Sequence, residues 1–216
     1  MPFEARIAPL DGKLPKVSYR WDPETDILSV ACKGVSKATG MNGTVDLEGA
    51  DGSFVVLDVV GGALRGLDVV TWPDDIRTVE VLPIPEAPTD GRVVFPTRRS
   101  QPGIAAVEVE TPLTVEKNQA ESVFHIRVGR QRRATTVRVA DHLLVDVDKQ
   151  SRLAGLWLLE VPPFPNVEAT AWSWTNGCSA TSSSCSPPKT PCSRACARDT
   201  PSRSFPPSTS RPTRAS

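Results

Sequence analysis

The sequence predicts a mainly β protein in which two related four-stranded antiparallel units pack on one core, with an α+β fold as the alternative. Three observations predict this. Apolar and polar residues alternate in short runs, the pattern of strands that bury one face. The runs recur in the same order about 88 residues further along the chain. A single four-stranded sheet is marginal alone, so two stacked sheets form the minimum fold.

We expect five segments along the chain. They are an N-terminal arm (1–15), a first β repeat (16–72), a Pro-rich connector (73–103), a second β repeat (104–165) and a tail (166–216) that is disordered or frame-shifted. The arm lacks the apolar region of a targeting signal, and no apolar run approaches the roughly 18 residues of a membrane span. We therefore expect a cytoplasmic protein without a membrane partner.

The first repeat is predicted to contain two hairpins. KVSYRWDPETDILSVAC (16–32) has strand-type residues on both sides of the turn DPETD, and VVLDVVGGALRGL (55–67) has them on both sides of a glycine turn. Alternation from Val55 to Val59 places Asp58 on the face opposite the apolar residues.

Two motifs of this repeat resemble ligand loops but are interpreted as turns. GGALRG (61–66) resembles a phosphate-binding loop, which needs a following helix, whereas strand-type residues follow here. DPETD (22–26) has the acidic spacing of a calcium loop, but Ile27 and Lys33 stand where that loop needs Gly and Glu.

The connector contains six prolines, which exclude a helix and interrupt strands. TVEVL and RVVF within it are candidate short edge strands. We interpret the connector as an ordered segment that crosses between the two sheets.

The second repeat matches the first in pattern. LLVDV (143–147) corresponds to VVLDV (55–59), and LAGL (153–156) corresponds to LRGL (64–67). PLTVEKNQAESVFHIRV (112–128) corresponds to the first hairpin.

Asp58 and Asp146 occupy corresponding positions in the two repeats. We expect both to face solvent or to take part in hairpin hydrogen bonds. A ligand site shared by the two at a pseudo-twofold axis is the alternative.

The cysteine and the tryptophans of the repeats have structural interpretations. Cys32 is the only cysteine before the tail, so no disulfide framework is expected, in agreement with a reducing compartment. Trp21, Trp72 and Trp157 are expected in the core or at its rim.

The first repeat resembles the YuzE-like family, a small bacterial domain of unknown function. The resemblance covers residues 16–72 well and 112–161 poorly. It implies a small β-rich or α+β fold and no activity. The matching residues are Tyr19, Asp22, Pro23, Asp26, Leu28, Asp58, Gly61 and Gly66 in the first copy, and Asp146, Asp148, Gly155 and Leu156 in the second.

The tail differs from the rest of the chain in composition and charge. Residues 171–216 contain 12 Ser, 6 Thr and 7 Pro, with 6 basic residues against one acidic residue, whereas residues 1–170 have 19 basic and 24 acidic residues. Such a segment cannot bury enough apolar surface to fold, and an abrupt switch of this kind is also typical of a shifted reading frame. Four cysteines are weak candidates for a zinc site: Cys178, Cys185, Cys192 and Cys196.

One basic cluster stands out in the second repeat. If its arginines lie on one sheet edge they can bind phosphates, although a solvated hairpin loop is the simpler interpretation. The cluster consists of Arg127, Arg130, Arg132, Arg133 and Arg138.

His125 and His142 are the only histidines. His125 alternates onto the polar face with Arg127, and His142 shares a face with Asp146. His142 and Asp146 are weak candidates for an acid–base pair, because no nucleophile motif accompanies them.

These observations predict a non-enzymatic cytoplasmic interaction or regulatory module without a cofactor, whose partner is another protein or a second copy bound at a strand edge. One alternative is a nucleic-acid-associated, antitoxin-like regulator that uses the basic cluster. The other is a small-substrate enzyme that uses His142 and Asp146.

Overall fold

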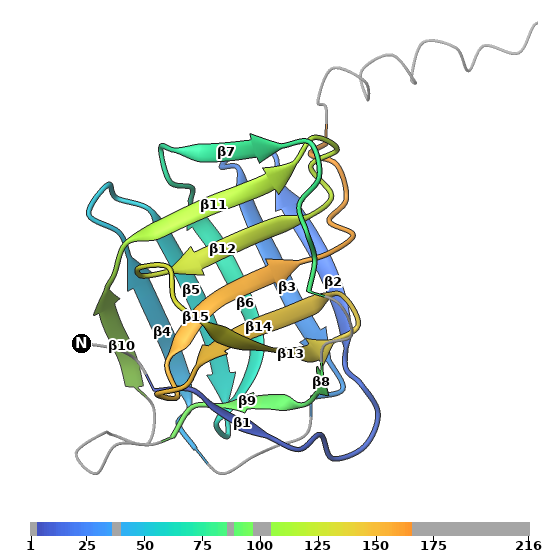
Figure 1. Ribbon diagram of the computed structural model, residues 1–216, viewed down its shortest axis with the longest axis vertical. Coiled ribbons are helices and arrows are strands. Elements are labelled where there is room, and N and C mark those ends of the chain that lie inside the picture. Colours follow the sequence, from blue (N-terminus) through green and yellow to red (C-terminus); the bar gives the residue numbers. More distant parts are fainter. Residues whose placement is uncertain (1–3, 36–39, 86–88, 97–104, 166–216) are drawn as a thin grey trace, which may run out of the picture. The chain divides into compact units, whose positions relative to one another are not determined.

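The computed structural model describes residues 4–35, 40–85, 89–96 and 105–165. This part of the chain forms two β-sheets and contains no helix, which confirms the predicted mainly β fold (Figure 1). All described residues belong to one compact unit, Met1–Trp174. The basic tail, with its four candidate zinc ligands, lies outside the described residues.

The first sheet contains eight strands. Its main run of neighbours is β2-β3-β6-β5-β4-β10, and the start of β6 also pairs with β9, which pairs with β1. Its strands are β1 (Arg6–Ala8), β2 (Lys16–Asp22), β3 (Ile27–Lys33), β4 (Gly43–Glu48), β5 (Phe54–Val60), β6 (Ala63–Thr71), β9 (Arg92–Val94) and β10 (Ala105–Glu110).

The second sheet contains seven strands in the order β7-β11-β12-β15-β14-β13-β8. These strands are β7 (Ile76–Val79), β8 (Thr89–Asp90), β11 (Leu113–Asn118), β12 (Phe124–Val128), β13 (Ala134–Ala140), β14 (Leu143–Asp148) and β15 (Leu153–Leu158).

The two sheets share the order of their five central strands. The order β2-β3-β6-β5-β4 in the first sheet corresponds to β11-β12-β15-β14-β13 in the second. In each sheet a bulge follows the aspartate that both repeats carry. The aspartate pairs with a threonine on one neighbouring strand and a glycine on the other: Asp58 with Thr44 and Gly66, and Asp146 with Thr136 and Gly155.

Each sheet contains the four expected antiparallel strands and adds one more repeat strand. The additions, β4 and β13, were not expected. Each strand has only two buried residues larger than alanine, namely Val45 and Leu47 in β4, and Val137 and Val139 in β13. So short an alternation is a weak sequence signal.

The connector supplies strands to both sheets. β7 and β8 join the second sheet in parallel with β11 and β13, whereas β9 joins the first sheet. β10, at the start of the second repeat, pairs in parallel with β4 of the first sheet. The chain therefore crosses between the layers several times, and the two repeats are not separate domains.

The core lies between the two sheets, whose strands cross one another (Figure 1). Alternate residues of each strand point inward, for example Leu57 and Leu67 from the first sheet and Val145 and Leu156 from the second. Orthogonal packing of this kind buries one face of each sheet and leaves the other face outside.

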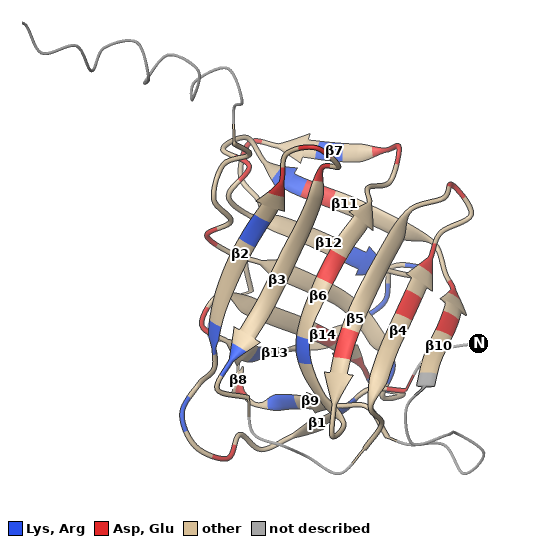
Figure 2. Ribbon diagram, turned by 180° about the vertical axis from the view of Figure 1, so that it is seen from behind, with Lys and Arg blue, Asp and Glu red and all other residues tan. Residues whose placement is uncertain are grey.

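The two outer faces differ. On the first sheet, exposed or half-buried residues alternate with buried ones, and acidic residues occur on β4, β5, β6 and β10 (Figure 2). On the second sheet the segment after β7 covers part of the outer face, because Leu82 packs on Leu144 and Trp157. β14 and β15 are consequently buried on both faces.

Candidate functional site

A cavity of about 430 Å³ lies where the end of the first repeat meets the edge of the second sheet. Both sheets contribute to it, since Trp21 belongs to β2, Ile76 to β7 and Phe124 to β12. We call it the aromatic pocket. Its lining residues are Trp21, Asp26, Trp72, Ile76, Lys117, Glu121, Phe124 and Phe164.

Four aromatic rings form the walls of the pocket. The ring centroids of Trp21 and Trp72 lie 5.9 Å apart at 27°, and Phe164 meets Trp21 edge-on at 5.2 Å and 74°. Phe124 lies 5.4 Å from Trp72 at 46°. The walls therefore face in several directions, and Phe164 remains 38% exposed at the mouth.

Hydrogen bonds fix both indoles in place. Trp21 Nε1 donates to the carbonyl of Pro162 over 2.8 Å, and Trp72 Nε1 donates to the carbonyl of Asp26 over 3.0 Å. Both indole N–H groups are thus occupied, so the two tryptophans contribute ring surfaces to the pocket and no free hydrogen-bond donors.

Three charged residues line the same cavity. Asp26 and Glu121 both have left-handed backbone conformations, with φ of 57° and 53°, at the turns that carry them. Lys117 forms an ion pair with Glu121, so these two charges offset each other. The carboxylate of Asp26 has no ion-pair partner among the described residues, and the lining carries a net negative charge.

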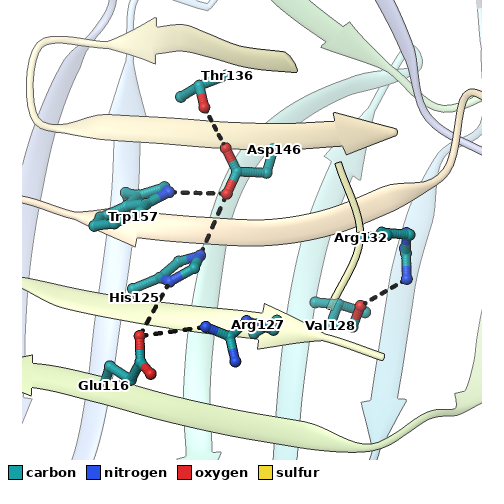
Figure 3. A network of polar contacts seen from close by, with 8 residues as sticks. All are labelled: Glu116, His125, Arg127, Val128, Arg132, Thr136, Asp146 and Trp157. Atoms are coloured by element: carbon teal, nitrogen blue, oxygen red, sulfur yellow. Dashed lines mark hydrogen bonds and ion pairs between the residues drawn. The ribbon is translucent and has the colours of Figure 1, made fainter. Parts of the chain in front are cut away.

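A second polar cluster lies on the outer face of the second sheet (Figure 3). His125 Nε2 lies 3.3 Å from Asp146 Oδ2, and the imidazole stacks on Trp157 with centroids 3.9 Å apart. Asp146 also accepts hydrogen bonds from Thr136 Oγ1 at 2.6 Å and from Trp157 Nε1 at 2.8 Å. On the other side of His125, Nδ1 lies 3.9 Å from Glu116 Oε2.

This cluster depends on a glycine. His125 lies on β12 and Asp146 on β14, so their side chains meet across β15 at Gly155. A Cβ atom there would lie 2.9 Å from His125 Nε2 and 3.1 Å from Asp146 Oδ2. Gly155 thus provides the space in which the imidazole reaches the carboxylate.

Burial and hydrogen bonding act in opposite directions on Asp146. Burial raises the pKa of its carboxyl group, but the hydrogen bonds from His125, Thr136 and Trp157 outweigh burial and hold the pKa below the ordinary value. Asp146 is therefore a stabilised carboxylate with its oxygens occupied. His125 and Asp146 are each only 8% exposed, and the cluster has the features of a structural network.

The predicted His142–Asp146 pair does not form. The histidine beside Asp146 is His125, which lies on the same face as Arg127, as expected, but is buried there. His142 lies instead 3.6 Å from Glu160 and 3.8 Å from Asp141. Alternation places residues on a face but does not reveal which neighbouring strand supplies the partner.

The corresponding aspartates lie on opposite outer faces of the two-sheet body. Asp58 is exposed on the first sheet, whereas Asp146 is buried on the second. Of the two expected roles, Asp58 has the solvent-exposed one, whereas Asp146 takes part in hydrogen bonds within its hairpins, from Thr136 of β13 and Trp157 of β15. A single ligand site shared by the two residues is excluded by the core between them.

The predicted basic cluster is partly neutralised. Arg127 pairs with Glu116 at 3.3 Å, Arg132 with Asp148 at 2.9 Å, and Arg138 with Asp90 at 3.7 Å. Arg130 and Arg133 are exposed. Two exposed arginines provide a much smaller basic surface than five.

Among the described residues, no three His, Cys, Asp or Glu side chains gather in a way that could hold a metal ion. Cys32 is buried, and burial raises the pKa of its thiol to about 11. The thiol is therefore protonated near neutral pH.

No protein-family model matches the chain, and no curated protein matches it. The resemblance to the YuzE-like family remains a prediction from the residues alone. The described part of the chain contains no helix that could cross a membrane.

The aromatic pocket was not predicted as a site. Trp21 and Trp72 were expected in the core or at its rim, but Phe124 and Phe164 were not connected with them. The available signal was a tryptophan near each end of the first repeat, with Trp21 directly before the turn that carries Asp26. The stacking partner of each ring is visible only when the sheets are packed.

Proposed function

We propose that the chain is a non-enzymatic binding module whose ligand or partner occupies the aromatic pocket. The observation that carries this proposal is the pocket of about 430 Å³ walled by four aromatic side chains, two of them half-buried tryptophans. A mainly apolar cavity of this size with a few polar groups is the usual form of a small-ligand site.

The rest of the described surface has no comparable aromatic cavity. A second cavity, of about 550 Å³, lies near the turns at Gly49 and Thr111 and has no aromatic residue in its lining. Neither cavity is lined by His142 or Asp146, the residues of the enzymatic alternative. The arginines of the nucleic-acid alternative are mostly engaged in ion pairs, and so neither alternative is favoured.

A ligand screen tests the proposal. The intact ¹⁵N-labelled chain is titrated with mixtures of neutral, anionic and cationic small molecules, and the indole N–H signals of Trp21 and Trp72 are followed by NMR. We expect at least one class of compound to shift these two signals while Trp157, which is buried against His125, remains unchanged.

Two matched variants locate the binding. Phe164→Ala removes an exposed ring at the mouth of the pocket, and Ile7→Ala removes an exposed apolar side chain of β1. Binding that is weakened by Phe164→Ala but not by Ile7→Ala supports the proposal. Equal effects of the two variants, or no shift of Trp21 and Trp72 with any compound, would contradict it.

A further inference from the structure

The aromatic pocket combines ring faces with negative charge. The face of an indole or phenyl ring is electron-rich and attracts a cation placed within about 6 Å of its centre. Trp21 and Phe164 stand nearly perpendicular, at 74°, and Trp72 and Phe124 add further faces. Non-parallel walls suit a rounded group better than a flat one, which needs two parallel faces.

The charges of the lining residues also favour a cationic ligand. Two acidic residues, Asp26 and Glu121, and one basic residue, Lys117, line the cavity, and Lys117 forms an ion pair with Glu121. A cationic ligand gains from the unpaired charge of Asp26, whereas an anion is repelled by it.

The scarcity of free donors argues against a hydrogen-bonding neutral ligand. Both indole N–H groups already donate to backbone carbonyls, and Lys117 is engaged with Glu121. A polyhydroxylated ligand could donate to the acidic residues of the lining, but its oxygen atoms would find few donors to replace their water contacts. A quaternary ammonium group has no donor to satisfy and is weakly hydrated.

We propose that the aromatic pocket recognises a quaternary ammonium group of a small organic cation. This inference rests on the proposed function, since it names the ligand class of the same pocket. The rings of Trp21, Trp72 and Phe164 contact the methyl groups of the cation, and Asp26 supplies the opposite charge. A quaternary ammonium group occurs both in a free small cation and in the choline headgroup of a lipid. The experiment distinguishes these two sources.

The test compares choline with its uncharged carbon analogue, 3,3-dimethyl-1-butanol, which has nearly the same shape. Each compound is titrated into the intact ¹⁵N-labelled chain at constant ionic strength. We expect choline to shift the indole signals of Trp21 and Trp72, but not that of Trp157. The neutral analogue is expected to bind roughly three- to thirtyfold more weakly, the factor that cation–π attraction implies.

Charge variants of one turn provide the second arm. Asp26→Asn removes the carboxylate from the pocket, and asparagine tolerates the left-handed backbone conformation of this position. Glu24→Gln removes an exposed charge from the same turn without touching the pocket lining. We expect Asp26→Asn to weaken choline binding roughly twofold to fivefold, as for an exposed ion pair, and Glu24→Gln to leave it unchanged.

Phosphatidylcholine vesicles provide the third arm. Co-sedimentation that free choline competes away assigns the group to a lipid headgroup, and choline binding without co-sedimentation assigns it to a free cation. Both outcomes support the inference. Equal affinity for choline and the neutral analogue overturns it while leaving the proposed function intact. Failure of every compound in the screen to shift Trp21 and Trp72 overturns both.

Discussion

At the residue scale, the two corresponding aspartates show how one sequence position acquires two different roles. Both pair with a threonine and a glycine on neighbouring strands. The residue that corresponds to His125 in the first sheet is Ser29, and the one that corresponds to Trp157 is Asp68. Asp58 therefore remains exposed, whereas Asp146 is enclosed by an imidazole and an indole.

Replacement of these aspartates by asparagine should have different effects. Asp146→Asn should lower the free energy of unfolding by about 1–3 kcal/mol at pH 7, because the amide cannot accept all three hydrogen bonds. Asp58→Asn should change it by less than about 0.5 kcal/mol, as is usual for an exposed position. Urea denaturation of the three proteins measures both values.

The effect of Asp146 should also depend on pH. Its pKa in the folded state lies below the ordinary value, so the stability that it contributes is present above its unfolded pKa of about 3.9. That contribution is lost as the pH falls through the folded-state pKa. The difference between the wild type and Asp146→Asn should therefore shrink when denaturation is repeated near pH 2. A difference that stays constant from pH 7 to pH 2 would show that the carboxylate charge does not matter.

Gly155→Ala tests the space between His125 and Asp146. The new methyl group would lie within 3.2 Å of His125, of Asp146 and of the Ile126 carbonyl oxygen. We therefore expect a loss of about 1–3 kcal/mol in unfolding free energy. In a His125→Ala background the loss should be smaller, with a coupling of at least about 0.5 kcal/mol in a double-mutant cycle. Additive effects of the two substitutions would indicate that the backbone contact alone is responsible.

At the scale of single elements, the outer faces of the two sheets differ because the segment after β7 covers part of the second sheet. Leu82 of this segment is 8% exposed and packs on Leu144 and Trp157, whereas the adjacent Val81 is 78% exposed. The connector thus serves as a cover over the second sheet as well as a link between the repeats.

These two neighbouring residues provide a matched test. Leu82→Ala should destabilise the protein by about 2–4 kcal/mol through the cavity that it leaves over Trp157. The tryptophan fluorescence of the folded state should also shift to longer wavelength as water reaches the indole. Val81→Ala should leave both quantities unchanged. Equal effects of the two substitutions would mean that the segment does not hold Leu82 against the sheet.

At the scale of the whole molecule, the predicted alternation and repeat identified the strands β2, β3, β5, β6, β11, β12, β14 and β15 and their division between two layers. They did not identify β10 or the pairing of connector strands, because parallel edge pairs join residues far apart in the chain and leave no local pattern. The aromatic pocket was missed for the same reason. Trp21, Phe124 and Phe164 are separated by many residues, and only the packing of the sheets brings them together.

The crossing of the chain between layers predicts that the halves do not fold independently. A fragment of residues 1–103 lacks β10 and the five central strands of the second sheet, β11 to β15, so we expect no cooperative unfolding transition and poor dispersion of its NMR signals. The intact chain, measured under the same conditions, is the control. A monomeric 1–103 fragment with a sharp transition would contradict this expectation.

The short strands of the connector have one more consequence. An unpaired strand edge is a template on which another chain can add a strand, and this is a route to aggregation. Both edges of the second sheet are formed by connector strands, β7 with four residues and β8 with only two. Edges so short offer few free backbone groups to a foreign strand. The segment that joins the two repeats therefore also protects one of the sheets against uncontrolled polymerisation.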